Sequence, residues 1–139
     1  MIRVIRRYDF SAAHVLARPD WSAARNRAVY GKCANPSGHG HNYRLELTLE
    51  GALDAATGRV AGLEALDEVV LPRVLAELDG RFLNRDVAAF ARVVPTAENI
   101  ARHVWDTLDG ALGPASLASV RLIETSNNSV EYFGGERNP

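Results

Sequence analysis

The sequence lacks several features that define whole classes of protein. Its 139 residues contain a single cysteine, Cys33, which excludes an internal disulfide framework and predicts a reducing, cytoplasmic location. No apolar run is long enough to span a bilayer. Residues 1–10 alternate charged and apolar side chains, which is unlike a signal peptide. We therefore expect a cytoplasmic protein without a membrane partner.

An excess of charge of one sign is also missing. Sixteen basic side chains face seventeen acidic ones, for a formal net charge of −1. Because nucleic-acid-binding proteins are usually strongly basic, we expect no nucleic-acid partner. Apolar residues make up 47% and charged residues 24%, which is the balance of a folded globular protein. The length predicts a single domain over residues 1–139.

Hydrophobic periodicity predicts four strands and two helices. The clearest strand is 43–50, where apolar and polar residues alternate strictly. The helical stripe of 63–78 contains Pro72, which lacks a backbone donor and predicts a kink or break. Thr96 is the expected N-cap of the second helix, with Glu98 suited to the positive end of the helix dipole. The remaining strands are expected over 2–10, 117–125 and 129–133.

The order strand, strand, helix, helix, strand, strand predicts an α+β fold. We expect a four-stranded antiparallel sheet with both helices on one face. Asn127 and Asn128 separate the last two strands, and asparagine tolerates the positive φ of a tight hairpin. Residues 15–40 form a long polar loop, and loops of this length are usually functional. The open edges of such a sheet favour a homo-oligomer.

Three of the four histidines flank this loop. His39 and His41 stand two apart at the start of a strand, so their side chains point to the same side. His14 follows the first strand, and pairing of the two strands would complete a three-histidine set. Three neutral imidazoles with an open fourth position are typical of a catalytic zinc site. The alternative is that these are ordinary polar turn residues; His103, within the second helix, is interpreted as a helix-surface or subunit-contact residue.

Cys33 lies six residues before His39 in the same loop. A free cysteine is usually a small buried apolar residue, but its neighbours here are polar residues, glycine and proline. A thiol near a cation or a metal has a depressed pKa and can act as a base or nucleophile. No nucleophile elbow, P-loop or dinucleotide fingerprint is found.

Five short stretches carry a resemblance to a known family. They are F-S-A-A-H ending at His14, Y-G-K-C-A-N-P-S-G-H-G-H-N-Y over 30–43, L-D-G-R-F-L-N over 78–84, P-T-A-E-N-I-A over 95–101, and E-T at 124–125. In this order and spacing the chain resembles the 6-pyruvoyl-tetrahydropterin synthase family, which includes the bacterial 6-carboxy-tetrahydropterin synthases. The resemblance runs nearly end to end.

The resemblance implies the tunnelling fold, or T-fold, in which trimers close into a barrel and two trimers commonly stack into a homohexamer. It implies a lyase that removes triphosphate from 7,8-dihydroneopterin triphosphate, with sites at subunit interfaces. The family's zinc ligands match the three histidines named above. Its proton-shuttling cysteine matches Cys33, its pterin anchor matches Glu124, and Thr96 and Glu98 match positions close to the pterin pocket.

The chain departs from the family at one catalytic position. The family's triad joins the cysteine to an adjacent aspartate and histidine, which are here Asp79 and Gly80. Loss of one acid/base partner commonly costs about 10²–10⁴ in rate. One hypothesis is therefore a zinc lyase in which zinc or Asp79 activates Cys33. The alternatives are a pterin-binding homologue without the standard synthase activity, and a zinc-stabilised oligomer.

The sequence determines neither the reaction product nor the residues that bind the triphosphate. The C-x5-H-G-H spacing resembles the pyruvoyl type, whereas the prokaryotic composition favours the 6-carboxy product of the queuosine pathway, which we prefer. Candidates for the triphosphate are Lys32, Arg25 and Arg27, by loop position only; otherwise they are solvated surface residues. Trimer and hexamer are equally compatible with the sequence.

Overall fold

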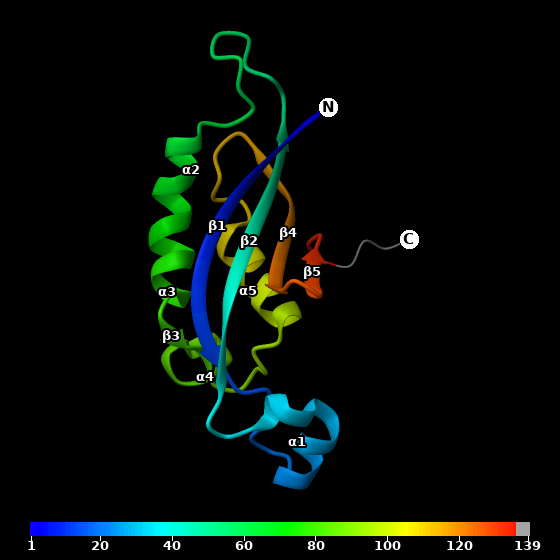
Figure 1. Ribbon diagram of the computed structural model, residues 1–139. Helices are drawn as coiled ribbons and strands as arrows, with labels where there is room; N and C mark the ends of the chain where they lie inside the picture. Colours follow the sequence, from blue (N-terminus) through cyan, green and yellow to red (C-terminus); the bar gives the residue numbers. More distant parts are fainter. Residues whose placement is uncertain (136–139) are drawn as a thin grey trace.

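A computed structural model describes residues 1–135 of the chain, in which helices cover one face of a β-sheet (Figure 1). The expected α+β class is confirmed. The strands are β1 (Ile2–His14), β2 (His39–Gly51), β3 (Arg81–Phe82), β4 (Ser116–Thr125) and β5 (Asn128–Tyr132). The helical segments are α1 (Ala23–Tyr30), η1 (Gly31–Ala34), α2 (Leu63–Val70), η2 (Leu71–Leu75), α3 (Ala76–Leu78), α4 (Leu83–Asp86), η3 (Ala88–Phe90) and α5 (Ala97–Leu108).

The strands form a single five-stranded sheet in the order β3-β1-β2-β4-β5. The four expected strands pair antiparallel in sequence-adjacent ladders, and β1 and β2 stay paired from Ile2↔Gly51 to His14↔His39. The fifth strand, β3, pairs parallel with the end of β1 and was not predicted. Two residues carry no periodic pattern, so only the tertiary pairing reveals this strand.

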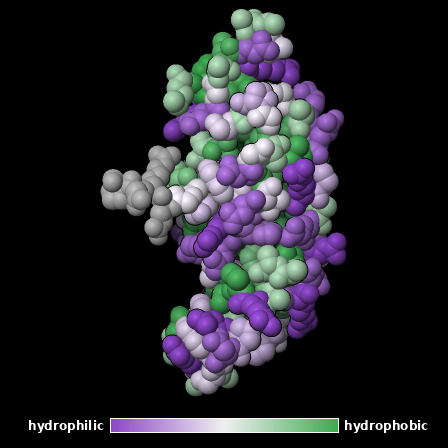
Figure 2. Space-filling view, turned by 180° about the vertical axis from the view of Figure 1, so that it is seen from behind, coloured by the Kyte–Doolittle hydropathy of each residue, from purple (hydrophilic) through white to green (hydrophobic). Residues whose placement is uncertain are grey.

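The core lies between the sheet and the helices α2 and α5. Strict alternation along β2 places its apolar side chains inward, as predicted: Tyr43, Leu45, Leu47 and Leu49 are buried. The stripe of α5 meets them, with Ile100, Val104 and Leu108 fully buried. Seen from behind, the molecule carries many hydrophilic side chains among scattered apolar ones (Figure 2). Among the described residues, no helix has the length and apolar character needed to cross a bilayer.

At Pro72 the helix changes type, where the sequence predicted a kink or a break. Between α2 and α3 the chain makes one turn of π-helix, η2, with Pro72 near its start. Because proline has no N–H, the regular i to i−4 ladder cannot pass through it, and a wider turn accommodates the gap. Helical backbone therefore continues without interruption over residues 63–78.

Two local expectations are wrong. Residues 15–40 are not one continuous loop, because they contain α1 and η1. Helix α1 has no apolar stripe that could have revealed it; it begins at the Ser22 N-cap, whose hydroxyl accepts from the Arg25 amide, and its single buried residue is Asn26. The β4–β5 hairpin forms, but Asn127 and Asn128 do not supply a positive φ, since every described residue with positive φ is a glycine.

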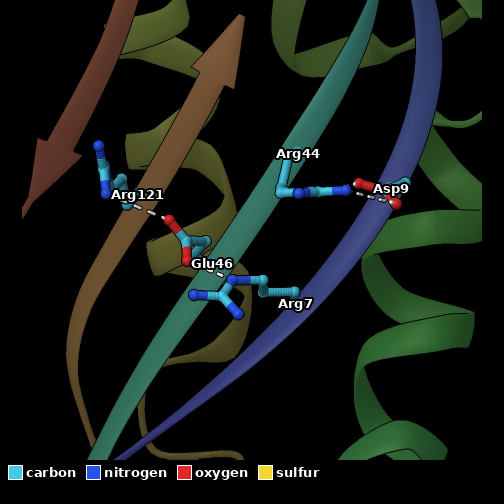
Figure 3. Close-up of polar contacts among 5 residues, drawn as sticks. All are labelled: Arg7, Asp9, Arg44, Glu46 and Arg121. Carbon is cyan, nitrogen blue, oxygen red and sulfur yellow. Dashed lines mark hydrogen bonds and ion pairs between the residues drawn. The ribbon is translucent and has the colours of Figure 1, made fainter. Parts of the chain in front are cut away.

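The other face of the sheet is polar and carries paired charges (Figure 3). The carboxylate of Glu46 is almost fully buried and accepts from Arg7 Nε at 2.7 Å and Arg121 Nη1 at 3.3 Å. Arg44 Nε donates to Asp9 at 3.0 Å. Opposite charges on neighbouring strands stabilise the pairing, so this face is polar without being strongly charged.

Candidate metal centre

The pairing of β1 with β2 brings three histidines together. His14 stands directly opposite His39, and His41 follows two residues later on the same side of β2. Residues opposite one another and residues two apart share a face of the sheet, so all three rings lie on the helix-covered side. Their ligand nitrogens lie within 4.8 Å of one another. The predicted three-histidine cluster is therefore present.

A backbone carbonyl fixes the orientation of the His14 ring. Its Nδ1 lies 2.8 Å from the carbonyl oxygen of Pro95, which can only accept, so Nδ1 carries the proton. The hydroxyl of Tyr43 is 3.4 Å from the same nitrogen. The Nε2 lone pair is then free to face the cluster, 3.0 Å from His39 Nε2. A histidine that ligates a metal usually donates its other ring N–H to a carbonyl, a carboxylate or a water molecule, as His14 does to Pro95.

The third ring, His41, has an unpartnered nitrogen. Its Nε2 is buried and has no hydrogen-bond partner among the described residues. Buried polar atoms are nearly always satisfied, and an unmet one in a histidine cluster fits a missing metal bond. Two ligands of a tetrahedral zinc, each about 2.0–2.1 Å from the ion, stand about 3.3 Å apart, close to the His14–His39 spacing. The residues present thus fit a divalent metal.

The electrostatics favour the neutral rings that bind metals. Burial lowers the pKa of His14, and its hydrogen bond to Pro95 opposes this shift only in part. Burial, followed by the charge of His41, lowers the pKa of His39. Metal ligation requires the unprotonated nitrogen, so these environments prepare both rings for ligation at neutral pH. His103 lies outside the cluster and contacts Glu77 with its Nε2 at 2.8 Å.

Cys33 is not part of the histidine cluster, and its backbone contacts the chain two residues after His14. Its backbone carbonyl accepts from the amide of Leu16 at 2.9 Å, which holds η1 against the chain just beyond His14. The side chain is partly buried. The Cys33 thiol is not one of the ligand atoms that cluster within 4.8 Å. The arrangement leaves the thiol available for a role other than metal binding.

Asp79 and Gly80 are hydrogen-bonded to β1 on the edge that pairs with β3. The Asp79 carboxylate accepts from the amide of Ser11 at 2.9 Å, and the Gly80 amide donates to the Ser11 carbonyl at 2.7 Å. In the described chain no hydrogen bond joins Asp79 to Cys33. Gly80 has φ +72°, and a Cβ built there would meet nothing within 4 Å. The position matching the triad histidine thus opens into space, on a backbone that favours glycine.

Glu124 is the carboxylate nearest the histidines. It lies near the end of β4, its side chain is 16% exposed, and its Oε1 is 3.9 Å from His41 Nε2. Asn128 Nδ2 donates to the same oxygen at 3.3 Å. A largely buried carboxylate with free acceptor capacity beside a metal centre suits recognition of a paired N–H group.

Thr96 and Glu98 lie at the start of α5. Thr96 is the predicted N-cap, accepting from the Asn99 amide at 3.2 Å, and it follows Pro95, so it lies close to His14. Glu98 is exposed and forms no hydrogen bond or ion pair within the described part of the chain. The chain therefore gathers the histidines, Glu124 and Thr96 at one end of the sheet, while Asp79 contacts Ser11 and Glu98 is exposed.

Two contributors were missed from the sequence. Pro95 acts through its carbonyl, which every residue possesses, so no sequence signal could single it out. Tyr43 could have been found, because the period of two that aligns His39 with His41 continues to position 43. Burial raises the pKa of Tyr43, with Glu124 adding to the shift, so the Tyr43 hydroxyl stays protonated beside His14.

Comparison with known proteins decides the family. Residues 3–135 match the model of the family described as 6-pyruvoyl tetrahydropterin synthase. The chain belongs to this family. A 6-pyruvoyl tetrahydrobiopterin synthase of Homo sapiens is 42% identical over 132 residues, covering 95% of this chain and 91% of the human one. The corresponding protein of Drosophila melanogaster is 41% identical over 93% of this chain and 77% of its own length.

Solved structures of the 6-pyruvoyl tetrahydropterin synthase family agree. The Caenorhabditis elegans 6-pyruvoyl tetrahydropterin synthase has a TM-score of 0.91 at 36% identity, covering 96% of each chain. The Plasmodium falciparum 6-pyruvoyl tetrahydropterin synthase, at 16% identity and a TM-score of 0.59, shows the fold alone. Membership of this synthase family supports an enzyme and confirms the resemblance drawn from the short motifs.

Proposed function

We propose that this chain is a zinc-dependent lyase that acts on 7,8-dihydroneopterin triphosphate and eliminates triphosphate. The observation that carries the proposal is the cluster of His14, His39 and His41 with Glu124 at its side, in a member of a tetrahydropterin synthase family. A pterin with a hydroxylated side chain suits both the Glu124 carboxylate and the metal centre. Its ring edge offers N–H donors to a carboxylate, and its hydroxyls are ligands for a metal with an open position.

The three histidines would hold the metal. Once bound, zinc supplies Lewis-acid chemistry that acidifies the C–H bonds next to the bound hydroxyls. Cys33 accepts and returns protons as the general base, which requires its thiolate within reach of the acidified carbon. Glu124 anchors the amino-pyrimidine edge of the pterin. Thr96 contributes to the pocket wall while it caps α5.

Asp79 and Glu98 are assigned to a site shared with a second subunit. In its own chain Asp79 contacts Ser11 at the β3 edge of the sheet, and Glu98 is exposed. We propose a homo-oligomer of the barrel-forming T-fold, a trimer or a hexamer, in which these residues face the site of a neighbouring subunit. The unpaired outer edges of β3 and β5 are the surfaces through which a sheet extends into such a barrel. The whole chain, residues 1–139, would act as one domain of this assembly.

The 6-pyruvoyl product now has more support than the 6-carboxy product. The human and insect relatives described above carry the pyruvoyl name. The preference for the 6-carboxy product drew only on composition, and it is kept as the second candidate. Mass spectrometry of the product distinguishes them, because the carboxy product has lost a two-carbon fragment. The free thiol of Cys33 suits a reducing cytoplasm in either case.

The test is incubation of purified, zinc-loaded protein with dihydroneopterin triphosphate. We expect triphosphate release that Cys33→Ala abolishes while pterin binding persists. Pterin binding by the native chain without any turnover would instead favour a binding homologue, disabled by the glycine at position 80. Absence of pterin binding would contradict both and leave a metal-stabilised oligomer.

A further inference from the structure

A cavity of about 670 Å³ occupies the lobe formed by residues 15–36, which lies at the bottom of Figure 1 around α1. Its walls come from the chain beyond β1, from α1 and from η1. The volume lies in the range of about 300–1,000 Å³ typical of small-molecule sites. No part of the metal centre itself lines this cavity, so a ligand in it would be held by different residues.

The walls carry positive charge without a matching acid. Three basic side chains line the cavity and no acidic one does. Arg18 is compensated, because its guanidinium donates to Asp20 at 2.9 and 2.8 Å. Arg27 and Lys32 have no ion pair within the described residues. Two cations are therefore available to an anion, and Arg and Lys are the usual ligands of phosphate oxygens.

The lobe is held in shape before any ligand arrives. The side chain of Asn26 is buried and closes the lobe on itself, accepting from the Arg18 amide at 2.8 Å and donating to the Arg18 carbonyl at 3.0 Å. The centroid of the Trp21 ring lies 5.0 Å from the guanidinium carbon of Arg18 and 4.0 Å from that of Arg25. Arg25 does not line the cavity. Of the three basic residues singled out in the sequence, the structure thus separates Arg25 from the other two.

The cavity adjoins the metal centre. Val15, in its wall, follows His14 directly, and Lys32 precedes Cys33. The amide of Leu16 donates to the carbonyl of Cys33 at 2.9 Å, which joins these two parts of the chain next to His14. The cavity wall therefore begins one residue away from His14 and one residue away from Cys33.

We propose that this cavity binds the triphosphate of the substrate through Lys32 and Arg27, an assignment that rests on the proposed function. The triphosphate is attached to the hydroxylated side chain of the pterin, so a side chain held at the histidines places it within reach of these cations. Groups that pair with the phosphate oxygens also stabilise the charge on the departing triphosphate.

The experiment compares two ligands, 7,8-dihydroneopterin and its triphosphate, by calorimetric titration of zinc-loaded protein. All proteins carry Cys33→Ala, so that the triphosphate is not consumed. We expect the triphosphate to bind the parent at least about tenfold more tightly than dihydroneopterin, since each charged hydrogen bond contributes about that factor. Lys32→Gln combined with Arg27→Gln should remove this advantage and leave dihydroneopterin binding unchanged.

Arg25→Gln is the matched control. It removes the same charge from the same lobe and loses the stacking on Trp21, yet it lies outside the cavity wall. We expect it to keep the advantage of the triphosphate. An equal loss in Arg25→Gln, or an advantage that survives the Lys32 and Arg27 substitutions, would overturn the assignment. If neither ligand binds the parent, the proposed function fails and the assignment with it; if dihydroneopterin binds without any triphosphate advantage, the assignment alone fails.

Discussion

The carbonyl oxygen of Pro95 lies 2.8 Å from Nδ1 of His14, although 81 positions separate the two residues in sequence. Pro95 immediately precedes the Thr96 N-cap of α5. The helix that covers the sheet thus also fixes the ring of the most buried histidine, which is 1% exposed. Packing of α5 on the sheet therefore also orients one of the three histidines, and a change that displaces the start of α5 also displaces His14.

Glu124→Gln is expected to weaken dihydroneopterin binding by about tenfold to a hundredfold. The amide replaces one acceptor by a donor that opposes the pterin N–H, and hydrogen bonds to charged groups contribute about 1.5–3 kcal/mol. Glu124 stands 3.9 Å from His41 and is not one of the three ligands, so zinc content should be unchanged. Titration with dihydroneopterin and elemental analysis of the same sample measure the two properties. Loss of zinc in this variant would contradict the separate roles.

Gly80→His is expected to be faster but less stable than the native protein. The new imidazole would enter open space where the family has its triad histidine, and a positioned acid/base group contributes about 10²–10⁴ in rate. A side chain at φ +72° costs about 1–2 kcal/mol of stability. Initial rates of triphosphate release and urea unfolding measure these effects.

Gly80→Ala separates the two contributions of that substitution. It carries the same backbone strain without the imidazole, so it should lose similar stability and gain no rate. A Gly80→His enzyme no faster than Gly80→Ala would show that the missing histidine does not limit this enzyme.

The contact between β1 and α2 is expected to weaken when the pH falls. The Asp67 carboxylate accepts from Arg6 Nη2 and from the Tyr8 hydroxyl, both at 2.6 Å. Arg6 first, and Tyr8 second, lower the pKa of Asp67 below its ordinary value. A carboxyl group whose pKa is lowered on folding stabilises the protein above the unfolded pKa of about 3.9, and this stabilisation is lost as the pH falls through the folded pKa.

Tyr8→Phe tests this contact. It should lower the free energy of unfolding by about 1 kcal/mol at pH 7, the usual contribution of one hydrogen bond, and by less at pH 3. Tyr132→Phe is the control, because the Tyr132 hydroxyl makes no hydrogen bond within residues 1–135. Urea unfolding of both variants at the two pH values measures the difference. An equal loss in both variants, or no dependence on pH, would refute the role of Asp67.

The elements that could be predicted from the sequence are those whose apolar residues recur at regular spacing. Alternation located β2 and placed His39 and His41 on one face, and the helical stripe with Thr96 at its start located α5. Features without a period were missed: the two-residue β3, and α1, whose single buried residue is the polar Asn26. The contact of Asp79 with Ser11 was hidden for another reason. A sequence motif does not give the partner of its carboxylate, and only the structure shows that Asp79 accepts from the Ser11 amide.

The central claim is that His14, His39 and His41 hold one zinc ion, and metal content measures it most directly. The protein is reconstituted with zinc, freed of excess metal and analysed by elemental mass spectrometry beside His39→Ala and His103→Ala. The account predicts one zinc per chain in the native protein and in His103→Ala, whose ring contacts Glu77 instead, and none in His39→Ala. Native protein without zinc, or His39→Ala with a full complement, would contradict it.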